Sequence, residues 1–69
     1  MFDPKVLRKA RLAAGLGYRE VGDAARLDQS TIAHYEAGRL RPSAHAAQRW
    51  RGGVQKLLAQ RLEAIAQVV

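Results

Sequence analysis

The stretch from Gly17 to Gly38 constrains the fold most strongly, because it contains two short helical segments on either side of a turn. We expect Asp28 to begin the second segment, since its carboxylate can accept hydrogen bonds from the amides of Ser30 and Thr31. We expect Gly38 to end this segment, because the residue after a helix often needs a positive φ, which glycine adopts without a Cβ clash. The stretch therefore predicts two consecutive short helices joined by a tight turn.

The second of these helices has two chemically different faces. Ile32 and Tyr35 fall on one stripe and are expected to be buried. The opposite face offers amide, hydroxyl, methyl and imidazole groups and is predicted to be free of carboxylates; its residues are Gln29, Ser30, Ala33 and His34. Such a face suits hydrogen bonding to the edges of base pairs in the major groove of DNA.

The charge of the chain agrees with a polyanionic partner. The 12 Lys and Arg residues outnumber the 6 Asp and Glu residues, and the resulting net charge of +6 is typical of nucleic-acid binding. Charge alone is also compatible with a merely soluble basic protein, and Lys5, Arg8 and Lys9 are either a solvated face or loose phosphate contacts. Few aromatic residues are available to stack on single-stranded bases, so double-stranded DNA is favoured over RNA.

Composition argues against several other classes of protein. A chain of 69 residues allows one small domain, which we place at residues 1–69. The chain has no cysteine, and His34 and His45 lack metal-ligand spacing, so we expect no metal and no cofactor. There is no catalytic triad, phosphate-cradling glycine loop or convergent carboxylate pair, so we do not expect an enzyme. No segment resembles a membrane span or a signal peptide, which predicts a cytoplasmic location.

The residues before the Gly17–Gly38 stretch predict a first helix over residues 1–14. Asp3 can cap this helix, and Pro4 suits its first position because an amide there has no helical partner. Phe2 can pack against Leu7 as a hydrophobic staple. The first helix is therefore defined at its start by local signals.

The next predicted helix spans residues 17–26 and begins weakly, because Gly17 has no side chain with which to cap it. Glu20 can reach back to the Gly17 amide, as in a capping box. Tyr18 and Arg19 lie at the start of this helix, where backbone amides and the helix dipole attract a phosphate group.

The loop after the two short helices carries Arg39 and Arg41, whose planar guanidinium groups suit phosphate binding. Pro42 prevents the preceding helix from continuing, and Ser43 can cap a further helix.

The remaining residues are helical in composition but are interrupted at Gly52 and Gly53. Each glycine costs about 1 kcal/mol in a helix interior. The sequence therefore favours two helices, residues 44–51 and 54–67, over one long helix bent at the glycine pair. The fold class is accordingly predicted to be all-α, with four to five helices.

The last predicted helix carries more apolar residues than a small monomer can readily cover, at spacings of three and four. We interpret residues 54–69 as a helix for dimerisation, with packing inside the monomer as the alternative. The residues assigned to the subunit interface are Val54, Leu57, Leu58, Leu62 and Ile65, and Val69 continues their spacing.

Three motifs occur in order along the chain: L-R-x-x-R in the first helix, G-L before the second, and DQSTIAHYEAGRLRPS from residue 28 to residue 43. On these motifs, residues 7–43 resemble the helix-turn-helix domain of the phage-repressor family, the Cro and lambda-repressor type also called XRE. The resemblance implies a lambda repressor-like bundle in which base pairs are contacted by Gln29, Ser30, Ala33 and His34. It also implies that Arg11 and Glu36 form a structural ion pair inside the fold.

Two positions depart from the pattern of that family. The family often has Thr-Gln at the start of the second helix, where the Gln holds a phosphate, whereas this chain has Gly17 and Tyr18. The Tyr18 hydroxyl or Arg19 would take over that contact. The family also favours glycine in the turn between the two helices, where this chain has Arg26. Either Arg26 adopts a left-handed conformation with mild strain, or the turn differs.

Together, these features predict a small homodimeric repressor of bacterial or phage origin, which regulates its own gene and binds a pseudo-palindromic operator in the cytoplasm, associated with the nucleoid. The phosphate contacts are assigned to Tyr18, Arg19, Arg39 and Arg41. The alternative is an antitoxin, whose C-terminal helix would bind a toxin as protein partner while the helix-turn-helix binds its own promoter.

Overall fold

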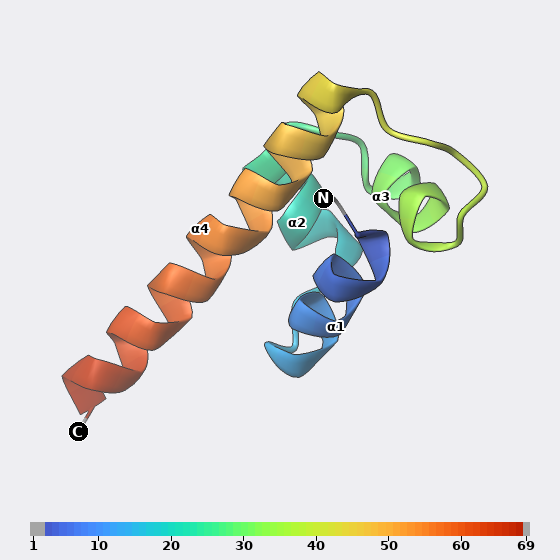
Figure 1. Ribbon diagram of the computed structural model, residues 1–69. Helices are drawn as coiled ribbons and strands as arrows, with labels where there is room; N and C mark the ends of the chain where they lie inside the picture. Colours follow the sequence, from blue (N-terminus) through green and yellow to red (C-terminus); the bar gives the residue numbers. More distant parts are fainter. Residues whose placement is uncertain (1–2, 69) are drawn as a thin grey trace.

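The computed structural model describes residues 3–68, which form four helices and no strand (Figure 1). The helices are α1 (Pro4–Ala13), α2 (Tyr18–Ala25), α3 (Gln29–Glu36) and α4 (Ala44–Val68). The prediction of an all-α fold is confirmed. The expected staple at Phe2 and the apolar position Val69 lie outside the described residues.

The first two helices begin as the sequence predicts. The Asp3 carboxylate accepts a hydrogen bond of 3.0 Å from the backbone amide of Lys5, and Pro4 occupies the first helical position. At the start of α2, the backbone amide of Gly17 donates to Glu20 Oε1 over 3.2 Å. Both contacts satisfy amides that lack a partner within the helix.

The start of α3 differs from the prediction, whereas the start of α4 agrees with it. Asp28 lies at the N-cap position of α3, but its carboxylate accepts no hydrogen bond from the amides of Ser30 and Thr31. It accepts instead from the Ser30 hydroxyl over 2.8 Å, because this short local contact competes with the capping geometry. At α4, Ser43 Oγ accepts from the amide of Ala46 over 3.1 Å.

The first three helices end in one backbone pattern, in which a residue with positive φ follows the last turn. That residue is Gly15 after α1, with φ of +68°, and Gly38 after α3, with φ of +74°. After α2 it is Arg26, with φ of 58° and ψ of 43°. Of the two alternatives that the sequence left open for this turn, the structure therefore adopts the left-handed conformation.

The last helix is continuous, so the prediction of two helices over 44–51 and 54–67 is wrong. The glycine pair does not break α4, because Gly53 lies where α4 crosses the end of α2. A Cβ atom built on Gly53 would lie only 2.8 Å from the backbone nitrogen of Ala25. Gly53 thus permits close packing of two helices, and this tertiary contact outweighs the low helix propensity of glycine.

The hydrophobic core lies between the helices, with α4 packed mainly against α2 (Figure 1), and it contains Leu7, Leu16, Val21, Ile32, Tyr35, Trp50 and Val54. The Tyr35 and Trp50 rings are 5.3 Å apart at their centroids, which joins α3 to α4. Val54 is only 1% exposed, so its assignment to a subunit interface is wrong. It is already buried within the single chain.

The C-terminal half of α4 extends beyond the other helices (Figure 1). Leu62 and Ile65 are 69% and 60% exposed there, whereas Leu57 and Leu58 pack partly against the core. None of the helices within residues 3–68 is both long and apolar enough to cross a membrane.

Candidate nucleic-acid interface

The outer face of α3 is anchored from behind by its buried side chains. Ile32 is fully buried and Tyr35 is 7% exposed, so the orientation of the helix about its axis is fixed by the core. The residues predicted to contact bases lie on the other side: Gln29, Ser30 and His34 are exposed, and Ala33 is half-buried. The structure thus brings the four predicted residues together on one accessible helix face.

The hydrogen bond between Ser30 and Asp28 determines what Ser30 can offer a ligand. A hydroxyl group has one hydrogen to donate and two lone pairs with which to accept. Because Ser30 donates its hydrogen to Asp28 Oδ2, its free capacity is that of an acceptor. In the major groove, acceptors pair with the amino groups of cytosine and adenine.

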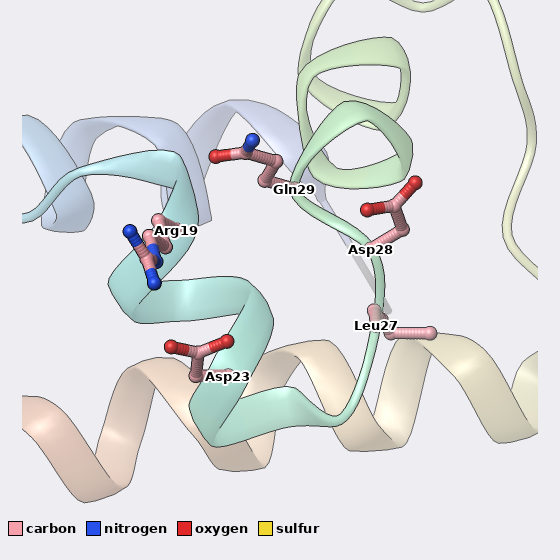
Figure 2. A pocket seen from close by; sticks show the side chains of 5 residues that line it. All are labelled: Arg19, Asp23, Leu27, Asp28 and Gln29. Carbon is pink, nitrogen blue, oxygen red and sulfur yellow. The ribbon is translucent and has the colours of Figure 1, made fainter.

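The four residues of this face carry no carboxylate, but two carboxylates, Asp23 of α2 and the N-cap residue Asp28, border its N-terminal end. A shallow depression of about 260 Å³ lies there between α2 and α3, and it is lined by Arg19, Asp23, Leu27, Asp28 and Gln29 (Figure 2). Figure 2 shows the Gln29 amide extending toward α2 and the Asp28 carboxylate directed away from it. The volume is small for a ligand pocket, so we interpret the depression as a surface groove between two helices and not as a small-molecule site. The N-cap position before Gln29 was the sequence signal for this acidic edge.

The basic residues predicted to hold phosphates are exposed, but they do not share one environment. Arg39 and Arg41 lie in the loop between α3 and α4, and Arg19 lies in the first turn of α2. Tyr18, which is 38% exposed, has its ring stacked on Arg11, with the guanidinium carbon 4.2 Å from the ring centroid. The buried Arg11 guanidinium therefore holds the Tyr18 ring in place by a cation–π contact.

Arg11 and Glu36 form a bidentate ion pair between α1 and α3. Arg11 Nε donates to Glu36 Oε2 over 2.7 Å, and a second Arg11 nitrogen donates to Oε1 over 2.9 Å. The remaining guanidinium nitrogen donates to the carbonyl of Leu16 over 2.9 Å. The hydrogen bond to Glu36 raises the pKa of Arg11 above its ordinary value despite the opposing effect of burial. The pair connects α1 with the last turn of α3.

Arg8 adds a contact that the sequence did not predict. Its Nε lies 3.8 Å from Glu36 Oε1, although the Arg8 side chain is largely exposed. Because the Arg8 side chain is 55% exposed and the distance is long, this contact adds less to stability than the Arg11 pair, although the Glu36 side chain is only 2% exposed. The sequence signal for this contact is the spacing of three residues between Arg8 and Arg11, which places both on one helix face.

Comparison with known proteins gives one finding on the family. A family model described as a helix-turn-helix domain matches residues 5–50, which is more than half of the chain. The searches of curated proteins and of solved structures gave no match. The match covers α1, α2 and α3 and reaches into α4. The chain therefore belongs to the helix-turn-helix domain family, which is a DNA-binding type of domain.

Proposed function

We propose that this protein is a sequence-specific transcriptional regulator of the phage-repressor type, which binds a pseudo-palindromic operator as a homodimer and represses its own gene. The observation that carries the proposal is the accessible outer face of α3, held from behind by the core and by the Arg11–Glu36 pair. A helix presented in this way can enter the major groove of duplex DNA.

Each residue on this face offers a different contact to the bases. Gln29 can donate to and accept from adenine at the same time, and such a pair discriminates against the wrong base by about 1–3 kcal/mol. Ser30 accepts from an amino group of cytosine or adenine, because its hydrogen is held by Asp28. His34 donates to a guanine or to a phosphate, and the Ala33 methyl packs against a thymine methyl.

The backbone of the DNA is held on both sides of α3. Arg39 and Arg41 follow the helix directly, and Tyr18 and Arg19 lie at the start of α2, where free amides favour an anion. Asp23 and Asp28 border the Arg19 side and repel phosphate there. This arrangement restricts the phosphate contact on that side to the start of α2.

The exposed part of α4 supplies the dimer interface in this proposal. Leu62 and Ile65 lie on its free half, and Leu57 and Leu58 continue the stripe toward the core. The alternative function is that of an antitoxin, in which a toxin rather than a second copy covers the same stripe. Sedimentation of the purified protein separates the two, because the repressor forms dimers alone and the antitoxin co-purifies with a stoichiometric partner.

Selection of bound sequences from a pool of random duplexes tests the proposal. We expect an inverted repeat whose half-sites lie about 34 Å apart, one helical turn, because two α3 helices of a dimer enter successive major grooves. Half-sites should place cytosine or adenine opposite Ser30. Recovery of unrelated sequences, with no enrichment over the input pool, would contradict sequence-specific binding.

A further inference from the structure

The turn between α2 and α3 is the one of the three similar helix ends that has no glycine at its left-handed position. Arg26 stands where Gly15 and Gly38 stand in the other two. A side chain in this conformation crowds the following carbonyl, so the turn is less favourable for arginine than for glycine. Something beyond local preference must therefore hold it.

The polar groups of this turn are satisfied partly from outside. The amide of Leu27 donates to the carbonyl of Gly22 over 2.9 Å, which closes the end of α2. The carbonyls of Ala25 and Arg26 have no amide left to accept from in a helix end of this type. Both accept from Arg49 of α4: its Nε donates to Ala25 over 3.2 Å, and a second nitrogen donates to Arg26.

α4 reaches the turn because of Gly53, which lies one helical turn after Arg49. A Cβ on Gly53 would meet the Cα of Ala25 at 2.9 Å, so the two backbones are in direct contact. Arg49 and Gly53 thus lie on one face of α4, directed at the same end of α2. The Arg49 guanidinium bridges two successive carbonyls at this point, so the contact depends on the relative position of both.

The position of the turn determines where α3 begins. A Cβ on Gly22 would lie 2.6 Å from the carbonyl oxygen of Leu27 and 3.3 Å from the backbone nitrogen of Gln29. The first residue of α3 therefore rests on α2 with no intervening side chain. A shift of the turn must displace Gln29, the first residue of the base-contacting face.

We propose that Arg49 is a positioning residue for DNA recognition: it holds the left-handed turn at Arg26 and so fixes the start of α3 relative to α2. This inference rests on the proposed function of α3, but the holding of the turn can be measured without DNA. Arg49 itself contacts no base and no phosphate in this proposal.

Amide hydrogen exchange tests the holding of the turn. In the Arg49→Ala protein, we expect the Leu27 amide to exchange about tenfold faster, while amides in the middle of α1 are unchanged. Arg51→Ala is the matched control, because Arg51 is exposed on the same helix and its loss removes the same charge. Unchanged exchange at Leu27 in Arg49→Ala, or equal acceleration in both variants, would overturn the inference.

Operator affinity at several salt concentrations tests the effect on recognition. Arg49→Ala should weaken operator binding about tenfold but leave the slope of log affinity against log salt unchanged, because no phosphate contact is lost. Arg49→Lys, which keeps the charge but not the planar fork, should recover only part of the affinity. A slope that falls by about one would make Arg49 a phosphate ligand and refute the positioning role.

The double variant Arg26→Gly with Arg49→Ala supplies the decisive comparison. Glycine adopts the left-handed turn without the clash, so affinity should return to within about threefold of Arg26→Gly alone. If the double variant binds as weakly as Arg49→Ala, the turn is not what Arg49 holds. If Arg49→Ala does not fold, Arg49→Gln replaces it in the same comparison. If the wild type itself enriches no operator, the proposed function fails, and hydrogen exchange still decides whether Arg49 holds the turn.

Discussion

The adjacent glycines of α4 give the sharpest prediction, because replacing each by alanine should change stability in opposite directions. Gly52 is exposed, and a Cβ built there has no neighbour within 4 Å. Gly53 is buried, and its Cβ would lie 2.8–2.9 Å from three atoms of Ala25, two of which belong to the backbone. The flexible end of a side chain can move aside, but a helix backbone cannot do so without shifting α2.

The magnitudes follow from two opposing effects. Alanine is favoured over glycine in a helix interior by about 1 kcal/mol, and this gain applies to both positions. Overpacking costs about 1–3 kcal/mol, and contact with backbone places Gly53 at the upper end of that range. Gly52→Ala should therefore stabilise the protein by about 1 kcal/mol, and Gly53→Ala should destabilise it by about 2 kcal/mol.

Thermal unfolding followed by the fluorescence of the single, buried Trp50 measures both effects. For a domain of this size, about 1 kcal/mol corresponds to about 4–8 °C in Tm. Gly52→Ala should melt above the wild type by that amount, and Gly53→Ala should melt below it by about twice as much. An increase of Tm in both variants would refute the reasoning, because it would mean that α4 does not rest on α2 at Gly53.

Four further predictions concern the ion pair, the two kinds of DNA contact and the subunit interface. Arg11→Ala leaves Glu36 buried without its main partner and should cost about 3–5 kcal/mol in urea unfolding; a loss below about 1 kcal/mol would contradict the structural role. Arg39→Ala should weaken binding to all duplexes alike and lower the salt slope by about one in fluorescence anisotropy. Ser30→Ala should retain non-specific affinity but lose about 1–3 kcal/mol of discrimination at one base pair of each half-site, measured with single-substitution operators. Ile65→Glu should shift the protein to monomers in sedimentation without lowering the Tm of the monomer, because Ile65 is 60% exposed in the single chain.

The parts of the fold that depend on neighbours in sequence were predictable. Caps at Asp3 and Ser43 and the helix end at Gly38 involve contacts within a few residues, and the structure contains them. The apolar spacing that placed Ile32 in the core is likewise local to one helix. These features need only propensity and periodicity, which a single sequence carries.

The parts that depend on tertiary contact were not predictable in the same way. Gly53 was interpreted as a helix breaker, because its low propensity is visible in the sequence and its contact with Ala25 is not. Val54 was assigned to a subunit interface, since spacing alone does not tell which turn of a long helix the core covers.

The candidate site shows the same division. The outward orientation of Gln29 follows from helix periodicity, but the direction of the Asp28 carboxylate depends on a choice between two local hydrogen bonds. The contact of Arg49 with the turn joins residues distant in sequence, so no local pattern indicated it. Recognition of the family supplied the Arg11–Glu36 pair, which spacing alone would not have identified.

The central claim is that the outer face of α3 contacts the bases of duplex DNA. The most direct measurement is an NMR titration of the isotope-labelled protein with its selected duplex, which follows side-chain and backbone amides residue by residue. We predict the largest chemical-shift changes at the Gln29 side-chain amide and at the backbone amides of Ser30 and His34. The signals of the exposed C-terminal part of α4, around Leu62 and Ile65, should stay unchanged. Changes confined to α4, with the α3 signals unmoved at saturation, would contradict the account.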